Sequence, residues 1–406
     1  MMGCGTSTQS GQPEKTKDGN KPLDPLYDLI MDENLAKNEY PEEKLNAMRA
    51  MENPSLVSKI CTKEIWDKYK DVVSSGPGKW TLARAINTGV MNRDSFVGCH
   101  AGDRESYDDF KDLFYPVIEG YHKGFSMEKG GLLAGTPSER MDPSKITVDL
   151  SDSAKSKIVS TRIRIARNLA MFPLNPGGTR ESRIEVAELM RKVYDTIPEG
   201  DELKGEMFLH STMSDEQRQK LIDDHFLFRG ADEMQAASGY HQYWPIGRGV
   251  YHNKEKTFIN WINEGDHIRI ISMRNGGDVK RVFSLLSKGA KMIEDGVKTV
   301  TGKSEAFMMH PKFGAVTCCP SNLGTGMRGS VHVLIPKLIA AWGFEKIDEE
   351  CRKRHCQARG STGERTKVID RVDISNWRRI GLPEYELVED MINCVNWLVE
   401  QEDGLP

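Results

Sequence analysis

The chain has 406 residues, of which 56 are lysine or arginine and 60 are aspartate or glutamate, for a net charge of −4. This balance gives the chain as a whole no attraction to nucleic acid or to an anionic membrane. The length can bury a sizeable core and predicts two domains. No apolar run is long enough to span a bilayer, and the eight cysteines lack paired CxxC spacing, so we expect a soluble cytoplasmic protein with free thiols.

The N-terminal segment has almost nothing apolar to bury in its first 24 residues, so we predict a disordered tail and place its end at residue 40. Within it, Met2-Gly3-Cys4-Gly5-Thr6-Ser7 fits the pattern for N-myristoylation of Gly3, with Cys4 available for palmitoylation. Two acyl chains anchor a protein stably where one does not. Gly3 becomes N-terminal only if translation starts at Met2, so two interpretations stay open: a lipid anchor to a membrane or cilium, and a featureless tail.

A helical pattern follows the tail. Apolar residues spaced three and four apart predict helices over 42–51, 60–73, 81–90 and 104–124. The loop over 92–103 between two of them is rich in small residues and is either a plain connection or a mobile loop that lines a site. Glycine and proline then punctuate 130–143, which is the best domain boundary in the chain.

Strand patterns dominate after this boundary. Over 157–167 apolar and polar residues alternate, so Arg162 and Arg164 share one face of a strand. Adjacent arginines repel unless an anion lies between them or carboxylates cover them. The pattern favours an anion site, with solvated arginines on an edge strand as the alternative. Further strands are predicted within 257–273 and around 371–375, and helices over 183–197, 215–226, 278–300 and 384–399.

The stretch from Thr317 to His332 combines two cysteines, a glycine-bearing turn and an arginine. Small residues let backbone N–H groups approach an anion, and Arg328 adds a forked, charged donor. Cys319 precedes the turn, where a thiolate could face a cationic substrate. A glycine-rich turn with a buried structural cysteine is the plainer alternative.

Arginines recur on the predicted strands and loop ends. They are Arg162, Arg164, Arg269, Arg328 and Arg359. The chain has no GxxxxGKS or GxxxxGKT loop, which leaves an ordinary P-loop unsupported. An arginine cradle suits a nucleoside triphosphate, because phosphoryl transfer is mostly positioning and charge neutralisation. Mg²⁺ would be held chiefly by phosphate oxygens and water, and we expect no metal bound by the protein itself. The residues alone favour an anion-binding enzyme, with phosphotransferase as the class.

A family resemblance extends this interpretation. The segment from Cys319 to Gly326 (CPSNLGTG) is similar to the signature of the phosphagen kinases, the ATP:guanidino phosphotransferases that include creatine and arginine kinases. Four further motifs agree in order: Ser160–Arg164, Ile222–Phe228, Tyr243–Gly249 and Asp373–Asn376. The resemblance implies an α+β fold, with a small all-α N-terminal domain over 41–129 and a larger catalytic domain over 144–406 whose antiparallel sheet is flanked by helices.

The resemblance also implies a reaction and its residues. The reaction is reversible phosphoryl transfer from MgATP to a small guanidino acceptor, so the expected partners are ATP or ADP and that acceptor, with no nucleic acid. The implied nucleotide-binding residues are Ser160, Thr161, Arg162, Ile163, Arg164, His225, Arg269, Arg328, Gly329, Ser330, Val331, His332, Arg359, Gly360, Ser361, Thr362, Gly363 and Glu364. The implied acceptor-binding residues are Phe96, Val97, Gly98, Cys99, His100, Cys319 and Glu364. The implied catalytic residues are Cys319, Glu364, Glu264, Arg269 and Arg328.

Several roles follow from the same resemblance. Cys319 would be a thiolate beside the guanidinium, hydrogen-bonded by Ser321, and Glu364 would hold the guanidinium from a mobile loop. His225 would lie against the nucleotide base. Loop closure would exclude water, so that ATP phosphorylates the acceptor instead of being hydrolysed.

One departure concerns Gly265. The family usually carries two consecutive glutamates where this chain has Glu264-Gly265, and the second one grips the guanidinium. We expect a working enzyme, because the arginines, Cys319 and Glu364 remain. A glutamate restored at Gly265 should raise kcat/KM if the site is merely impaired, whereas a fall would indicate a rebuilt site.

The acceptor is expected to be L-arginine, because the loop over 90–100 is short and both Glu364 and Tyr121 match the arginine-kinase pattern. The segment Val97–Asp103 instead resembles the creatine-kinase loop, and taurocyamine or another guanidino acid is the next choice. A weakened family member acting as a structural or tethering protein stays open. A protein-arginine kinase is disfavoured, because the small helical domain is present.

Overall fold

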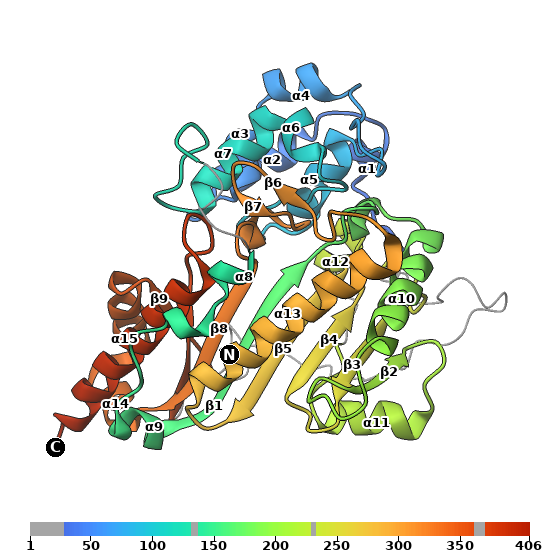
Figure 1. Cartoon of the computed structure of the whole chain (residues 1–406). Coiled ribbons are helices and arrows are strands. Elements are labelled where there is room, and N and C mark those ends of the chain that lie inside the picture. The colour runs from blue at the N-terminus through green and yellow to red at the C-terminus, as the bar shows by residue number, and fades with distance from the viewer. Residues whose placement is uncertain (1–27, 131–136, 229–232, 361–369) are drawn as a thin grey trace.

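The computed structural model describes residues 28–130, 137–228, 233–360 and 370–406. Figure 1 shows a smaller helical domain above a larger domain built on a sheet. Several predicted residues lie outside the described ranges: Gly3, Cys4, Ser361, Thr362, Gly363 and Glu364.

The regular elements of the small domain's described part are helices, beside one isolated β-bridge between Val73 and Thr81. Its helices are α1 (Glu33–Ala36), α2 (Glu42–Arg49), α3 (Leu56–Ile60), α4 (Lys63–Tyr69), α5 (Leu82–Met91), α6 (Ser106–Asp109) and α7 (Lys111–Tyr121). Hydroxyl caps begin several of them; the Thr62 and Thr81 side chains accept from the third N–H of α4 and α5, both at 3.3 Å. These helices confirm the helical pattern predicted from the sequence.

The predicted tail extends too far toward the C-terminus, because residues 28–40 belong to the folded small domain. The amide of Asn87 on α5 donates to the Ile30 carbonyl at 2.8 Å and accepts from the Asp32 N–H at 2.9 Å. Asp32 then caps α1, and Leu35 is 2% exposed within the small-domain core. One buried amide and one buried leucine therefore order a segment whose composition gave little sign of structure.

The larger domain contains one eight-stranded sheet in the order β2-β3-β4-β5-β1-β8-β10-β9. Its strands are β1 (Ile158–Arg167), β2 (Gly205–Leu209), β3 (Gly249–Asn253), β4 (Phe258–Ile262), β5 (Ile268–Asn275), β8 (Met327–Leu334), β9 (Cys356–Gly360) and β10 (Arg371–Asn376). Every neighbouring pair is antiparallel. A separate two-stranded ribbon pairs β6 (Met309–His310) with β7 (Gly314–Ala315). The predicted antiparallel sheet is confirmed.

Helices flank the sheet as predicted. The described helices of the larger domain are α8 (Pro137–Arg140), η2 (Pro143–Lys145), α9 (Asp152–Lys157), η3 (Asn175–Gly177), α10 (Arg180–Asp195), α11 (Asp215–Asp223), α12 (Glu233–Ser238), α13 (Val279–Thr301), η4 (Pro320–Asn322), α14 (Pro336–Lys353) and α15 (Glu384–Asp403). The two long helices α13 and α15 pack against one face of the sheet (Figure 1). Among the described residues, no helix is long and apolar enough to cross a membrane.

Alternation along β1 gives the two faces of the sheet opposite characters. Ile163 and Ile165 are fully buried in the main hydrophobic core with α13 and α15. Arg162 and Arg164 point to the opposite face, because successive side chains of a strand alternate. The helices therefore cover the apolar face and leave the arginine face to form a site.

The segment that enters the signature joins the small domain's core instead of the main core. Phe313, Val316, Cys318 and Leu323 belong to the same hydrophobic cluster as the buried residues of α3, α5 and α7. The Tyr107 hydroxyl also donates to the Thr317 carbonyl at 2.7 Å. The small domain thus helps to position the signature.

Candidate active site

The sheet register brings arginines from separate strands onto one face. Arg162 and Arg164 lie on β1, and Arg164 is directly opposite Arg328 of β8. On the other side of β1, Arg269 of β5 is directly opposite Ala166. Residues directly opposite each other in a ladder point to the same face. Four of the five predicted arginines therefore converge on three adjacent strands.

The same face continues toward the sheet edge. His332 of β8 lies opposite Ser160 of β1, and the Ser160 Oγ is 3.2 Å from the His332 Nδ1. His332 also lies opposite Asp373 of β10, which in turn faces Arg359 of β9. Arg359 thus joins the other arginines, and β10 places one carboxylate between the two outer cations, Arg328 and Arg359.

Two of these arginines have no hydrogen bond or ion pair to any described residue. They are Arg162 and Arg164, which are half-buried on β1. Burial, followed by the charges of Arg328 and Arg269, lowers the pKa of Arg162 to about 10. Burial and the neighbouring arginines lower the pKa of Arg164 well below its usual value. This crowding of like charge matches a site that is completed by an anion.

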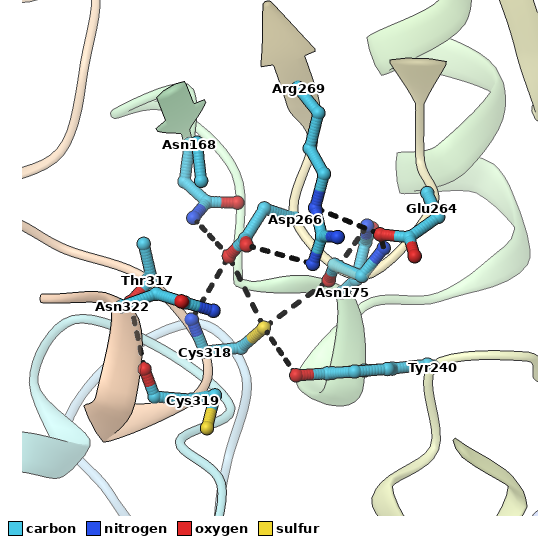
Figure 2. Close-up of polar contacts among 12 residues, drawn as sticks. Asn168, Asn175, Tyr240, Glu264, Asp266, Arg269, Thr317, Cys318, Cys319 and Asn322 are labelled. Carbon is cyan, nitrogen blue, oxygen red and sulfur yellow. Dashed lines mark hydrogen bonds and ion pairs between the residues drawn. The ribbon is translucent and has the colours of Figure 1, made fainter. Parts of the chain in front are cut away.

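The flanking arginines have counterions. Arg269 Nε is 2.9 Å from Glu264 Oε2, and Arg269 Nη2 is 3.8 Å from Asp266 Oδ2 (Figure 2). Burial alone lowers the pKa of Arg269, but the charges of Glu264 and Asp266 outweigh it and raise that pKa. Arg328 pairs with Asp373. The face is therefore most positive at its centre, on β1.

Some residues predicted to bind nucleotide turn their side chains the other way. Ile163 and Val331 are 0% and 1% exposed within the main core. The Thr161 hydroxyl donates to the Gly276 carbonyl at 2.8 Å, and the Gly329 N–H donates to the Asn376 side chain at 2.8 Å. The prediction took whole motifs, whereas strand alternation gives the arginine face only every second residue of β1 and β8. Ser330, directly opposite Arg162, stays on that face.

His225 lies just beyond α11, at the margin of this face. It is exposed and has a positive φ of 59°, in the left-handed region. The next residue, Phe226, accepts a hydrogen bond from Trp261 Nε1 at 2.7 Å, and the Arg162 guanidinium lies over the Trp261 ring at 5.3 Å. The residue after His225 is therefore linked to the arginine face through the Trp261 ring, and the role of His225 beside a nucleotide base stays a prediction.

A backbone bridge closes the signature loop. Ala315 and Gly324 form an isolated antiparallel bridge, and η4 lies between them. Gly324 has a φ of 93°, and a Cβ there would lie 2.2 Å from the Arg379 carbonyl oxygen. Only glycine fits this position. Arg379 donates to the Ser321 carbonyl and, at 2.7 Å, to the Asn322 side chain, so it holds the loop from inside.

Cys319 is half-buried at the start of this loop, whereas the other six described cysteines are buried. Its Sγ lies 3.0 Å from the Ser321 Oγ, the contact that the sequence predicted. Burial raises the pKa of Cys319, although hydrogen bonds from Ser321 oppose the shift. Burial alone therefore disfavours the charged form of this thiol, and the thiolate expected beside a bound guanidinium stays a prediction.

Comparison with known proteins agrees with this arrangement. Residues 51–119 match the family described as ATP:guanido phosphotransferase, N-terminal domain, and residues 185–405 match ATP:guanido phosphotransferase, C-terminal catalytic domain. The arginine kinase of Plodia interpunctella is 41% identical over 370 residues, which cover 89% of this chain and 98% of that protein. The chain belongs to the ATP:guanido phosphotransferase family. The predicted family, and with it the predicted class of enzyme, is confirmed.

Other relatives differ in the acceptor that they are named for. An arginine kinase of Anthopleura japonica is 41% identical over 373 residues, covering 90% of this chain but 49% of that protein. A crystal structure of lombricine kinase matches with a TM-score of 0.78 and 34% identity, covering 86% of this chain and 92% of that one. The duplicated taurocyamine kinase of Schistosoma mansoni matches with a TM-score of 0.79 and 34% identity, covering 90% of this chain and 49% of that one. This chain therefore spans about half the length of the Anthopleura japonica and Schistosoma mansoni proteins.

The loop from Phe96 to His100 was predicted to close over the acceptor. The Phe96 side chain is 51% exposed and lies 6.1 Å from the Tyr121 ring. The rest of the loop is packed into the small domain: Val97 accepts from the Val57 N–H at 3.3 Å, and His100 is 5% exposed. Among the side chains of these five residues only that of Phe96 is exposed here; the predicted closure uses mostly backbone groups and stays a prediction.

A buried polar network behind Cys319 was missed by the sequence analysis. The Cys318 Sγ lies 3.1 Å from the Tyr240 hydroxyl and 3.2 Å from Asp266 Oδ1 (Figure 2). Asp266 also accepts from the Asn168 side chain at 2.8 Å. Asn168 and Tyr240 stand in no recognised motif, so only the three-dimensional arrangement reveals them. No cluster of three or more His, Cys, Asp or Glu side chains suited to a metal occurs among the described residues.

Proposed function

We propose that this chain catalyses reversible phosphoryl transfer from MgATP to the guanidino group of L-arginine. The observation that carries the proposal is the arginine face, where Arg162 and Arg164 have no described counterion and lie beside the Cys319 loop. A triphosphate supplies the missing negative charge, and its Mg²⁺ arrives as part of the substrate.

The transfer itself follows from this placement. A terminal guanidino nitrogen attacks the γ-phosphorus, an N–P bond forms as the P–O bond to the β-phosphate breaks, and ADP leaves. The guanidinium releases one proton, and we assign its acceptance to the carboxylates Glu264 and Glu364. Arg164, Arg269 and Arg328 stabilise the charge that develops on the phosphoryl oxygens. Cys319 and Ser321 steady the guanidinium.

L-arginine is favoured over other acceptors by the 41% identity to arginine kinases over about nine-tenths of this chain. Taurocyamine and other guanidino acids remain alternatives, supported by the two structural relatives that are 34% identical. A coupled ATP assay with L-arginine, taurocyamine, lombricine, creatine and an arginine-bearing protein tests the choice. We expect the largest kcat/KM with L-arginine, and a larger value for any other acceptor would overturn it.

A second candidate function is structural tethering by a catalytically weakened member, which Gly265 favours. In that case MgADP binds while none of the acceptors is turned over. N-terminal acylation at Gly3 and Cys4 would supply the tether. Metabolic labelling with a myristate analogue, on a chain that starts at Met2 and on its Gly3→Ala control, tests the anchor. Absence of label from both would exclude it.

A further inference from the structure

Gly265 occupies the position where the family usually has a second glutamate, and nothing in its backbone requires glycine. Its φ lies outside the left-handed region, unlike those of Gly324 and Gly326. The reason for the missing side chain must therefore be found in the space around the residue.

That space is already occupied. A Cβ built on Gly265 would lie 3.0 Å from Arg269 Nη2, 3.2 Å from Tyr240 Cε2 and 3.5 Å from Tyr240 Cζ. The first two distances are tighter than ordinary contacts of a Cβ, and a longer side chain would have to pass the same atoms. The Tyr240 ring and a side chain at position 265 therefore compete for one volume.

The Tyr240 ring cannot easily move away, because both domains hold it. Its hydroxyl lies 3.1 Å from the Cys318 Sγ, next to Cys319 in the chain. The His100 ring of the small domain meets it edge-on, with centroids 5.0 Å apart. The His100 Nδ1 is itself 2.8 Å from the Thr88 Oγ1. Tyr240 is 8% exposed, so it is a fixed part of this corner.

We propose that Tyr240 is a specificity-determining residue of the acceptor site, where its neutral aromatic ring stands in place of the second carboxylate. The inference rests on the proposed function, because it assigns the acceptor's guanidinium to this corner. An aromatic ring attracts a guanidinium through its face, although more weakly than a carboxylate does. The acceptor site accordingly carries one negative charge fewer and one more apolar wall than the usual family pattern.

Four proteins test the proposal: the wild type, Tyr240→Ala, Gly265→Glu and the double variant. In the wild-type background we expect Gly265→Glu to lower Tm by a few degrees and to reduce kcat/KM for the acceptor about tenfold, because the new side chain is overpacked. Tyr240→Ala should raise the acceptor KM about tenfold and leave the ATP KM unchanged. The double variant is compared with Tyr240→Ala alone. In that background Gly265→Glu should no longer lower Tm or kcat/KM.

Two controls separate packing from chemistry. Tyr240→Phe keeps the ring and loses the hydroxyl, so an acceptor KM raised much less than in Tyr240→Ala would assign the effect to the ring, and an equal rise would overturn that assignment. Gly404→Glu is the matched substitution at a site where a Cβ meets nothing closer than 3.5 Å, and it should change neither quantity. Equal effects of Gly265→Glu in the two Tyr240 backgrounds would overturn the proposal.

The proposed function can fail separately from this inference. A wild type that binds MgADP but phosphorylates no guanidino compound overturns the function, and the acceptor role of Tyr240 with it. The Tm values of the four proteins would still show whether Tyr240 excludes a side chain at position 265. A coupling in Tm without any coupling in acceptor KM would restrict Tyr240 to a packing role and overturn its part in specificity.

Discussion

The two halves of the candidate site are built in different ways. The half that we propose to bind the nucleotide, the nucleotide half, is a single surface, in which neighbouring strands of one sheet place the arginines by register. The half that we propose to bind the acceptor, the acceptor half, is assembled from the β4–β5 turn, the signature loop and a loop of the small domain, which meet around Tyr240 and Cys318. The strand register of one sheet fixes the arginine positions in the first half. The second depends on how segments far apart in the sequence pack into one hydrophobic cluster with the small domain, so substitutions can alter it more readily.

The largest expected effect belongs to the nucleotide half. Arg164→Ala removes a cation that no described carboxylate neutralises, and we expect kcat to fall about 10²–10³-fold. Stability should stay constant or rise, because repulsion from Arg162, Arg269 and Arg328 is relieved. Steady-state kinetics and thermal unfolding measure the two effects.

The matched control for this change is Arg274→Ala, an exposed position on β5 that faces away from the arginines, opposite Thr161. It should alter neither activity nor Tm. Parallel losses of activity and stability in Arg164→Ala would assign Arg164 a structural role. The nucleotide half would then depend on packing, as the acceptor half does.

The nucleotide half could be predicted from the sequence because the alternation of side chains along a strand depends on neighbouring residues alone. A strand period of two is enough to place Arg162 and Arg164 together, and the pattern over 157–167 became β1 with a boundary difference of one residue. The same rule, applied strictly, would have removed Thr161 and Ile163 from the site. The prediction included every residue of the motif, although only alternate side chains of a strand lie on one face.

A carboxylate at the border between the halves provides the second test. Glu264→Gln removes the partner of Arg269 Nε, 2.9 Å away. We expect MgADP to bind more tightly, because a negative charge near the phosphates is lost, while kcat falls about 100-fold as a proton acceptor is lost. Calorimetric binding and steady-state kinetics separate the two effects. An unchanged kcat would reduce Glu264 to a counterion for Arg269.

The acceptor half could be predicted only in part. Cys319 and Ser321 lie two positions apart in a recognisable motif, and the family resemblance implied the hydrogen bond between them, which is 3.0 Å long. Tyr240 lies 78 positions from Cys318 in sequence, and no local pattern links it to Gly265. The burial of Cys319, which raises the pKa of its thiol, also comes from tertiary packing. Such contacts arise from the docking of the two domains.

Acid should weaken that docking through His122. Its Nε2 lies 2.8 Å from the Pro320 carbonyl oxygen, and burial lowers its pKa to about 4. The folded state holds this histidine neutral while the unfolded state binds a proton below about pH 6.5, so stability falls as pH drops from 6.5 toward 4. At pH 5 the loss from this one group is about 2 kcal/mol.

Replacement tests this assignment. His122→Gln keeps a hydrogen-bond donor and should flatten the fall of Tm between pH 7 and 5, whereas His355→Gln, at an exposed position, should leave it unchanged. Denaturant unfolding at both pH values gives the difference. An unaltered pH dependence would mean that the contact between His122 and the signature loop does not contribute to acid sensitivity.

The smallest expected effect concerns the Cys319 thiol. Because burial raises its pKa, alkylation by iodoacetamide should be slower near neutral pH than for a free thiol and should accelerate as pH rises. Ser321→Ala removes the side-chain hydrogen bond that lowers this pKa and keeps the backbone one, so the same profile should move to higher pH. Cys4→Ser in every protein removes the cysteine outside the described residues, and the six buried thiols react slowly. A midpoint below that of a free thiol would mean that nearby positive charge controls Cys319 even without ligand. The acceptor half would then share the electrostatics of the arginine face, and the two halves would no longer be independent.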